Sequence, residues 1–380
     1  MTPSTNTTQN FDVTVIGIGG MGSAALYHLA KRGSRVCGVE QFSPGHNLGS
    51  SHGDSRMIRA AYHEHPDYVP LVLRAFEHWR RLGDESGQIL LETPGVLMVG
   101  HDGSKVLAGM RDSAMLHGIP IEDIARDDFA QRFPGFSLPP DMQSTFEPGA
   151  GFVHVEAAVR QMTALAVQAG ATLYQEETVL SWQAKPHAIE VITDKRRINT
   201  ERLVLTAGPW IKDLLGKLNL PLQLHKMMML WFSPHNKPAP NQPGFGYDLP
   251  GGFYYGLPQV SPYGIKVGKH VAEDPIDHPD SFDRTLTQRH LEPISRFVKA
   301  YLPFLSDQVT RHASCIYTMT PDEHFIVDQY PSDPRVVFAS SCSGHGFKFA
   351  PVIGEILADL CLNGSTELPA DFLRLGQRFA

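Results

Sequence analysis

Residues 12–22 read Asp12-Val-Thr-Val-Ile-Gly-Ile-Gly-Gly-Met-Gly22, an apolar run that leads into the spacing Gly-x-Gly-x-x-Gly. The run predicts a short buried strand, and the residues from Met21 to about Lys31 predict a helix. A second strand-like run over residues 35–40 ends in Glu40. Strand, glycine turn, helix, strand and acid in this order indicate a dinucleotide-binding unit. The motif alone does not distinguish FAD from NAD, and a glycine-rich turn that binds no ligand is the alternative.

The three glycines and the acid of this unit have separate expected roles. Gly17 permits the tight turn, Gly19 lets backbone N–H groups approach a pyrophosphate, and Gly22 lets the helix pack on the strand. The positive end of the helix dipole favours the pyrophosphate. Glu40 is placed to accept hydrogen bonds from the ribose hydroxyls, and its charge would repel the 2′-phosphate of NADP.

Composition limits the class of protein. A chain of 380 residues is long for one core, so two domains are expected. The formal net charge of −7 argues against a nucleic-acid-binding surface, and no apolar run reaches the roughly 18–20 residues of a membrane span. The polar first ten residues do not resemble a signal peptide. Four cysteines without metal-like spacing predict no metal site, no disulfide framework and a cytoplasmic protein.

The strand–glycine–helix pattern returns twice further along the chain, at residues 203–215 and 335–361. We therefore expect an α/β protein whose dinucleotide-binding domain is discontinuous. The predicted limits of that Rossmann-like domain are residues 1–90, 151–220 and 320–380. The remaining segments, 91–150 and 221–319, hold short strands and proline-rich turns, which predict a second, mainly antiparallel β domain.

Several polar residues are ambiguous when taken singly. Arg56 and Arg59 would share one cationic face if their stretch were helical, or they are simply solvated. Lys266 and His270 alternate onto one face of a predicted strand, a pattern that usually faces solvent. By itself, Cys315 would be interpreted as a buried structural thiol.

Six further motifs follow in order along the chain. They are Gly-Ser-Ser-His-Gly-Asp-Ser-Arg-Met-Ile-Arg at 49–59, Phe-Tyr-Tyr-Gly at 253–256, Ile-Lys-Val-Gly-Lys-His at 265–270, Cys-Ile-Tyr at 315–317, Pro-Asp-Glu-His-Phe-Ile at 321–326 and Gly-His-Gly-Phe-Lys at 344–348. With the glycine turn, they resemble the monomeric sarcosine oxidase and N-methyltryptophan oxidase family of FAD-dependent amine oxidases, nearly end to end. The resemblance implies a two-domain architecture like that of glutathione reductase and D-amino-acid oxidase.

The resemblance also implies a cofactor site. Family members hold FAD covalently through a cysteine thioether, and Cys315 matches that position. His345 would bind the flavin through its backbone. The residues expected at the cofactor are Gly17, Gly19, Gly22, Glu40, Ser51, His52, Arg56, Val179, Cys315, Gly344, His345, Gly346 and Lys348.

A second set of matches concerns the substrate. Arg59 and Lys348 match the pair that binds the carboxylate of a secondary amino acid, which needs charge-assisted hydrogen bonds when it is buried. Lys266 matches the lysine that promotes reaction with oxygen, where a cation would stabilise superoxide. Residues matching those around the substrate amine are Tyr255, His270 and Tyr317. For these three, a satisfied core tyrosine or histidine is the alternative.

The chain departs from the family at informative positions. Ser51 stands where sarcosine oxidases typically carry histidine. Gly246 replaces a methionine and Leu257 a phenylalanine, so we expect a roomier pocket than sarcosine needs. Residues 209–215 and 268–270 are closer to the N-methyltryptophan branch, which leaves the amine substrate open.

The sequence thus predicts a monomeric flavoprotein oxidase that demethylates an N-methyl amino acid. Its partners would be that substrate and dioxygen, with no nucleic acid and no membrane, and its products the primary amino acid, formaldehyde and hydrogen peroxide. Three alternatives stay open: an oxidase of another N-alkyl, cyclic or glycated amino acid, a flavin dehydrogenase, and a non-catalytic dinucleotide-binding module. Because the amine must be unprotonated to lose hydride, we expect activity to rise with pH.

Overall fold

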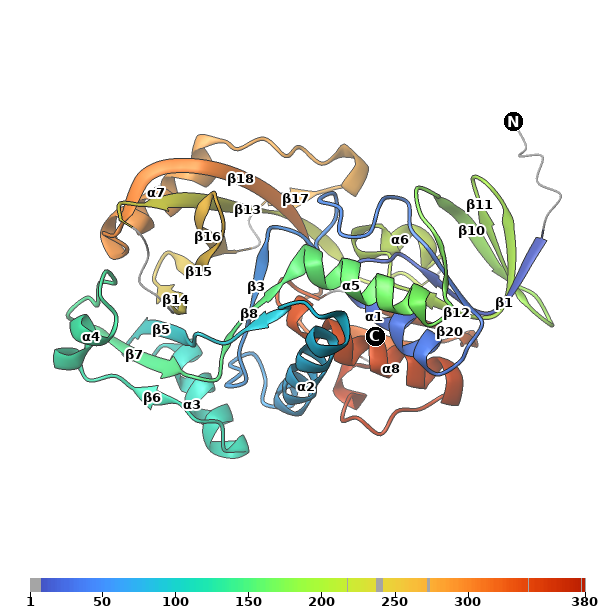
Figure 1. Cartoon of the computed structure of the whole chain (residues 1–380), viewed down its shortest axis with the longest axis horizontal. Coiled ribbons are helices and arrows are strands. Elements are labelled where there is room, and N and C mark those ends of the chain that lie inside the picture. The colour runs from blue at the N-terminus through green and yellow to red at the C-terminus, as the bar shows by residue number, and fades with distance from the viewer. Residues whose placement is uncertain are drawn as a thin grey trace.

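The computed structural model describes residues 8–216, 218–236, 242–271, 274–340, 342–376 and 378–379. The molecule is elongated, with an eight-stranded sheet towards one end, a nine-stranded sheet towards the other and a three-stranded sheet between them (Figure 1). Within the described ranges, no helix is both long enough and apolar enough to cross a membrane.

The eight-stranded sheet draws on three separated parts of the chain. Its strands are β1 (Thr8–Ile16), β2 (Val36–Val39), β9 (Thr172–Tyr174), β10 (Val179–Ala184), β11 (Ile189–Thr193), β12 (Arg197–Leu205), β19 (Ile326–Tyr330) and β20 (Asp333–Ser340). Five of these strands run parallel in the order β9-β2-β1-β12-β20, and β19 adds an antiparallel edge beyond β20. The hairpin of β10 and β11 extends from the first half of β12. This arrangement confirms the discontinuous Rossmann-like fold, and we propose the predicted limits as its boundaries.

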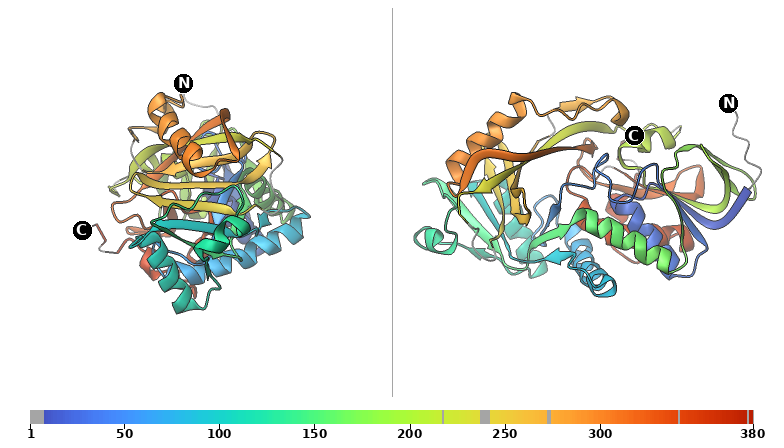
Figure 2. Two further views of the ribbon diagram at one scale, coloured as in Figure 1. Left: turned by 90° about the vertical axis from the view of Figure 1, so that its left-hand side faces the viewer. Right: turned by 45° about the horizontal axis from the view of Figure 1, so that its top comes forward.

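Both faces of the parallel sheet are covered, which explains its continuous apolar strands. Val15 and Val204 point into a core shared with four helices, whereas Ile16 and Leu205 point into a second core shared with β11 and α6. The helices of the first core are α1 (Gly20–Lys31), α2 (Tyr68–Ser86), α5 (Val155–Gln168) and α8 (Ala350–Asn363), and α6 is Ile211–Leu214. Figure 2 shows these helices gathered against the sheet.

The nine-stranded sheet is antiparallel except for one pair, β14 with β5. Its strands are β5 (Val96–His101), β6 (Glu122–Asp123), β7 (Met142–Glu147), β13 (Gln223–Pro234), β14 (Gly244–Leu249), β15 (Gly252–Ser261), β16 (Gly264–His270), β17 (Asp274–Ile276) and β18 (Leu305–Met319). The path runs β13-β16-β15-β14-β5-β7-β6, with β18 on the other edge of β13. The proline-rich stretch predicted as turns between strands includes residues 237–241, which lie outside the described residues.

The two faces of this sheet have different occupants. One face packs Leu230, Tyr247 and Val267 against α7 (Gln288–Tyr301) in an apolar core. Cross-strand pairs place Lys266 beside Trp231 and Cys315 beside Met227, so these residues share the opposite face. That face looks towards the site described below.

Smaller elements join the two sheets. The three-stranded sheet contains β3 (Ser55–Ile58), β4 (Leu91–Glu92) and β8 (Gly151–His154), and the remaining helices are α3 (Lys105–His117) and α4 (Arg126–Arg132). Short 3₁₀ turns cover Gly208–Trp210, Pro279–Ser281, Phe347–Phe349 and Asp371–Leu373. One of them precedes the helix predicted within residues 335–361: Phe347–Phe349 form a 3₁₀ turn, and α8 begins at Ala350.

Candidate active site

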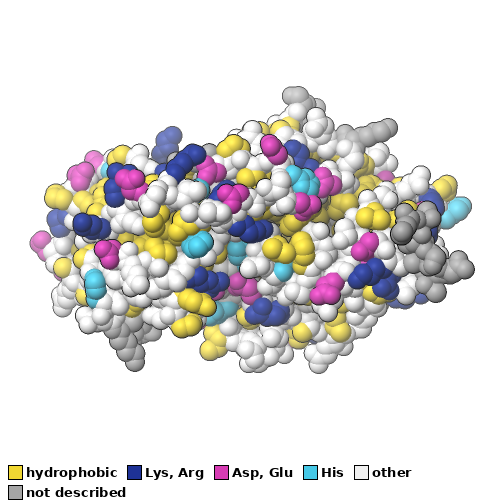
Figure 3. Space-filling view, turned by 90° about the horizontal axis from the view of Figure 1, so that it is seen from above, with side chains coloured by type: hydrophobic (Ala, Val, Ile, Leu, Met, Phe, Trp, Pro, Cys, Tyr) yellow, Lys and Arg dark blue, Asp and Glu magenta, His cyan; other side chains and the backbone are white. Residues whose placement is uncertain are grey.

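A cavity of about 480 Å³ is lined by residues from both large sheets. One end is formed by the glycine turn after β1 and by the end of β2. The other end is formed by the segment after β3 and by β15, β16 and β18. On the surface seen in Figure 3, charged side chains of both signs are interspersed and no broad area carries a single sign.

The glycine turn is held by close backbone packing. Gly17 has φ = +85°, a conformation that favours glycine, and a methyl group on Gly22 would lie 1.8 Å from the carbonyl oxygen of Gly17. A methyl group on Gly19 would meet only the hydroxyl of Ser51, at 3.8 Å. The turn is therefore closed towards the protein and open at Gly19, which lines the cavity.

Glu40 is fixed at the end of β2. One carboxylate oxygen accepts a hydrogen bond from Ile18 N at 2.7 Å and the other from Phe42 N at 3.0 Å. The side chain is almost fully buried, which raises its pKa, and it lines the cavity together with Val179. Since a carboxylate oxygen can accept more than one hydrogen bond, Glu40 retains capacity for the hydroxyls of a ribose.

His52 tests whether a cofactor fits here. Its side chain is buried, and Nε2 has no hydrogen-bond partner within the described part of the chain. Burial, then the nearby Arg56, lowers its pKa to about 3, so the ring is neutral. A buried polar atom without a partner is costly, and a hydrogen-bonding group of a bound cofactor would relieve that cost. Together with the open glycine turn and Glu40, it fits a flavin dinucleotide.

Arg59 follows β3 and is 4% exposed. Its Nη1 donates to the carbonyl of Ala61 at 3.1 Å, and its Nη2 donates to both carboxylate oxygens of Glu64 at 2.9 Å and to Nδ1 of His63 at 2.7 Å. Burial alone would raise the pKa of Glu64, but Arg59 and His63 hold it well below its usual value. Arg59 thus binds a carboxylate already, and that carboxylate belongs to the protein.

Lys348 lies in the connection between β20 and α8. Lys348 and Arg59 both approach the ring of Tyr62. The guanidinium carbon of Arg59 is 4.8 Å from the ring centre of Tyr62, and Nζ of Lys348 is 4.9 Å from it. Nζ also donates to the carbonyl of His345 at 2.8 Å. Burial lowers the pKa of Lys348 to about 7, with Glu64 opposing the fall and Arg59 adding to it. Two cationic groups therefore converge at this end of the cavity.

Neutral aromatic and imidazole groups stand near these cations. His270 Nδ1 lies 3.1 Å from the hydroxyl of Tyr317, and burial lowers the pKa of His270 to about 4. Burial raises the pKa of Tyr255 to about 12 and that of Tyr317 well above its usual value. All three line the cavity, so it offers hydrogen bonds here without added charge.

Cys315 and Lys266 lie behind the lining. Lys266 is 1% exposed, and its Nζ donates to the carbonyls of Gly53 and Ser55. The alternative of a solvent-facing lysine is therefore wrong, because the face it occupies is covered by residues 53–55. Burial raises the pKa of the Cys315 thiol, and the cations of Arg56 and Lys266 oppose the rise.

The cavity brings together most residues predicted from the sequence. Those in its lining are Gly17, Gly19, Glu40, Ser51, Arg56, Arg59, Val179, Tyr255, His270, Tyr317, Gly344, His345, Gly346 and Lys348. Four predicted residues lie outside the lining: Gly22, His52, Cys315 and Lys266.

The expected extra room at Gly246 and Leu257 is absent. A methyl group on Gly246 would lie 2.5 Å from the ring of Phe253 and 2.6 Å from the sulfur of Met98, so these two side chains already fill that space. Leu257 is fully buried, and neither position is in the lining. Phe253 is in the lining, and it takes the place that a larger residue at 246 would occupy.

Sequence reasoning missed Glu64, Tyr62 and Phe253. The polar run His63-Glu64-His65 directly after the strand of Arg59 was the available signal for Glu64. Phe253 stood in a recognised motif, but its neighbours across β14 and β5 could not be known from spacing. Tyr62 carries no local signal, because its contacts come from residues 59, 345 and 348.

Comparison with known proteins agrees with this geometry. The family model described as FAD dependent oxidoreductase matches residues 12–360. The chain is 37% identical to a monomeric sarcosine oxidase of Streptomyces avermitilis, with 94% of this chain and 95% of that protein covered. It is 33% identical to an N-methyl-L-tryptophan oxidase of Yersinia pestis, covering 92% and 94%. The solved structure of NikD, an amino acid oxidase, superposes with a TM-score of 0.87 at 25% identity, covering 96% of this chain and 97% of that one.

Proposed function

Because the chain belongs to the family of FAD-dependent oxidoreductases, we propose that it is an amine oxidase that demethylates an N-methyl amino acid. The N-methyl amino acid, dioxygen and water would give the primary amino acid, formaldehyde and hydrogen peroxide. FAD, when bound, would supply the acceptor for the hydride equivalent and the route by which the electron pair reaches dioxygen. The protein's own residues bind, orient and screen the substrate.

One observation carries this proposal: Arg59 and Lys348 converge on Tyr62 at the far end of a cavity that begins at the dinucleotide turn. Glu64 pairs with Arg59, and burial lowers the pKa of Lys348, so these two groups favour a further anion that binds both. A substrate carboxylate would provide that anion through charge-assisted hydrogen bonds. The relatives named as oxidases of sarcosine and N-methyl-L-tryptophan act on molecules that carry such a carboxylate.

Glu64 sets a condition on binding. It occupies Nη2 of Arg59 with both carboxylate oxygens, so a substrate carboxylate must displace it or share the guanidinium. Arg59 has five donors in a planar fork, which suits exchange of one carboxylate for another. The substrate would therefore replace a protein carboxylate that otherwise balances the charge of Arg59.

The amine end is held by neutral groups. His270 and Tyr317 form a hydrogen-bonded pair, and the low pKa of His270 keeps its ring uncharged at neutral pH. A neutral surrounding disfavours a protonated amine, and only the unprotonated amine can lose a hydride. We propose that Tyr255, His270 and Tyr317 orient this neutral amine.

We further propose that Cys315 carries the flavin as a thioether. Its thiol is buried on the sheet face that also carries Lys266; burial raises its pKa, and the nearby Arg56 and Lys266 oppose that rise. Denatured wild-type protein should keep its yellow colour after precipitation and washing, and Cys315→Ala should release it. As a matched control, Cys361→Ala removes another buried thiol far along α8 and should leave the colour bound.

The function is tested by measuring peroxide and formaldehyde across a panel of amines. The panel should contain N-methyl amino acids from sarcosine to N-methyltryptophan, cyclic and glycated amino acids, and N-methylamines without a carboxylate. We expect stoichiometric peroxide and formaldehyde from at least one N-methyl amino acid. Peroxide without formaldehyde, obtained from a cyclic or glycated amino acid, would favour the alternative oxidase.

The dehydrogenase alternative has its own measurement. Flavin reduced by the amino acid should be reoxidised by dissolved oxygen faster than turnover, and an artificial quinone should not be needed. If reoxidation occurs only with the quinone, the oxidase assignment fails. Absence of flavin reduction by every amine would instead favour the non-catalytic module.

A further inference from the structure

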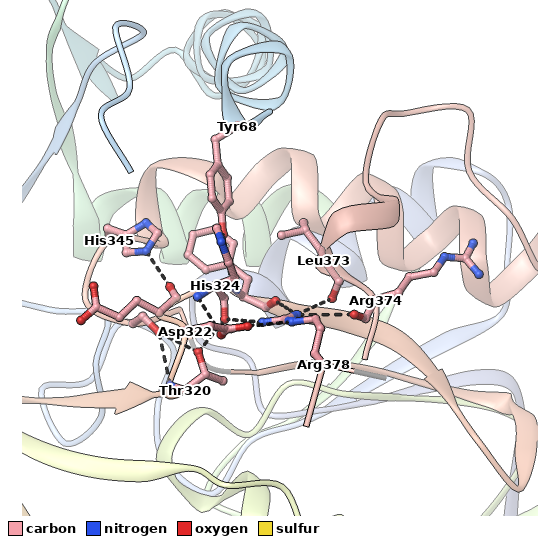
Figure 4. Close-up of polar contacts among 11 residues, drawn as sticks. Tyr68, Thr320, Asp322, His324, His345, Leu373, Arg374 and Arg378 are labelled. Atoms are coloured by element: carbon pink, nitrogen blue, oxygen red, sulfur yellow. Dashed lines mark hydrogen bonds and ion pairs between the residues drawn. The ribbon is translucent and has the colours of Figure 1, made fainter. Parts of the chain in front are cut away.

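The loop between β18 and β19 is held from outside by one arginine. Residues 320–325 form this loop, and Arg378 reaches it from the segment after the last 3₁₀ turn (Figure 4). Arg378 Nε and Nη2 donate to the two carboxylate oxygens of Asp322 at 3.0 and 2.9 Å. Such a planar, bidentate pair fixes orientation as well as position.

The remaining donors of Arg378 go to backbone carbonyls. Nη2 also donates to the carbonyl of His324 at 3.3 Å, and Nη1 donates to those of Phe325 at 2.8 Å and Leu373 at 3.3 Å. All five N–H groups of the guanidinium therefore have acceptors. Four of the five act on the loop, so the arginine fixes the path of its backbone.

Among the contacts of this loop with the cavity wall, the one that Glu323 makes concerns His345. Glu323 has φ = +59°, and its carbonyl lies 3.1 Å from Nε2 of His345. A carbonyl only accepts, so Nε2 must carry the hydrogen, and in the neutral ring Nδ1 must then be an acceptor. Burial lowers the pKa of His345 to about 3, which keeps the ring neutral.

The tautomer of His345 orients the next two groups. Its Nδ1 accepts from the hydroxyl of Tyr62, which leaves the Tyr62 oxygen free to accept from Nζ of Lys348 at 3.4 Å. The main-chain carbonyl of His345 also accepts from Nζ of Lys348. The direction of donation therefore runs from Lys348 through Tyr62 and His345 to the Glu323 carbonyl.

We propose that Arg378 is a positioning residue for the carboxylate-binding end of the cavity. By fixing the loop at Asp322, it places the Glu323 carbonyl that selects the tautomer of His345, and so holds Tyr62 and Lys348 as an oriented pair. The role given to Lys348 rests on the proposed function, whereas the orientation of His345 does not.

The experiment compares Arg378→Met with Arg374→Met in the holoenzyme. Arg374 is four residues away and pairs with Asp371 at 3.1 Å, so it makes a matched control on the same segment. The first measurement is the ¹⁵N-resolved histidine ring spectrum, with the His345 signals assigned by their loss in His345→Gln. Wild type and Arg374→Met should show the Nε2–H tautomer, and Arg378→Met should show a mixture of the two tautomers.

The second measurement separates KM from kcat for the N-methyl amino acid found to be oxidised. We expect Arg378→Met to raise KM about tenfold and to change kcat less than threefold, the size expected for coupling through a hydrogen-bond network. If Arg378→Met does not fold, Asp322→Asn tests the same link, because it weakens the bidentate pair and keeps an acceptor. Asp322→Asn should produce a smaller shift in the same direction.

An unchanged His345 spectrum in folded Arg378→Met or Asp322→Asn overturns the proposal. Equal changes in Arg374→Met also overturn it, because they would mean that the segment merely stabilises the fold. The ring spectrum needs no substrate. If no N-methyl amino acid is oxidised, the spectrum alone still decides the positioning role, and the proposed function fails separately.

Discussion

The two ends of the cavity are built in different ways. The dinucleotide end is made by one short segment whose backbone packs on itself, with Gly22 against the carbonyl of Gly17 and Glu40 fixed by Ile18 N. The charged end is made by side chains from separate segments, with Arg59 and Lys348 both approaching the ring of Tyr62. The first end tolerates no change of backbone shape, whereas the second depends on the balance of its charges. Substitutions at the two ends should therefore have different effects.

The largest effect is expected at the dinucleotide end. Gly22→Ala would place a methyl group 1.8 Å from the carbonyl oxygen of Gly17, and the turn must open to relieve the overlap. We expect protein purified without bound flavin and destabilised by about 3 kcal/mol, measured by the flavin-to-protein absorbance ratio and by denaturant unfolding. Gly149→Ala, which meets no atom within 4 Å, should retain flavin and stability. A fully flavin-loaded Gly22→Ala would contradict the close-packing explanation.

The next effect is at the charged end, where the fold should survive. Arg59→Met should lower kcat/KM for the amino acid substrate by about 100-fold, since loss of one buried charged partner costs a few kcal/mol. It should change activity on an N-methylamine without a carboxylate far less. The double variant Arg59→Met with Glu64→Gln also removes the carboxylate charge that the single variant leaves unpaired. Comparing the two variants separates the loss of substrate binding from the effect of that unpaired charge. Equal losses on both classes of substrate would show that Arg59 does not bind the carboxylate.

A smaller effect is expected from pH. Lys348 is charged below its lowered pKa of about 7 and loses that charge as the pH rises. The affinity for a non-oxidisable carboxylate such as acetate should therefore fall by about tenfold between pH 6 and 9, because the attraction between the carboxylate and the charge of Lys348 is lost. The rate of oxidation of an amino acid substrate should instead rise with pH, because the substrate amine deprotonates. Lys348→Met should flatten the acetate profile, and a wild-type profile without a step would place the pKa of Lys348 elsewhere.

The smallest effect concerns the side pocket beside the charged end. Phe253→Ala would empty the space next to Gly246 and Met98, and should shift the ratio of kcat/KM towards large N-methyl amino acids by about tenfold or less. Gly246→Ala should act in the opposite sense, because its methyl group would push the Phe253 ring into the cavity. Turnover of a panel of N-methyl amino acids measures both ratios. If both variants shift this ratio in the same direction, the explanation that Phe253 fills the pocket is wrong.

Sequence predicted the dinucleotide end well because its determinants are local. The spacing of Gly17, Gly19 and Gly22 fixes backbone geometry within a few residues, and Glu40 closes the adjacent strand. The two returns of the chain to this sheet could also be predicted, because each return repeats a strand–glycine–helix pattern. Local periodicity carries this information without knowledge of neighbours.

The charged end could be named only by resemblance, and only in part. Alternation placed Lys266 on a solvent face, but residues 53–55 cover that face in the fold. The glycine at 246 suggested room, but Phe253 comes from the neighbouring strand and fills it. Glu64 was not considered, although it pairs with Arg59 and balances its charge. These are facts about packing between strands and loops, which spacing within one segment does not encode.

The order of strands around β12 has a consequence for biosynthesis. The second half of β12 pairs with β20 through Leu203 and Leu205, yet β20 is translated more than a hundred residues later, after the whole nine-stranded sheet. Until then the nascent chain carries an apolar strand with an open edge, a template for pairing with other chains. Expression of this protein should therefore depend on slow translation or on chaperones that shield that edge. The cavity between the two sheets cannot be completed before residue 348 has left the ribosome.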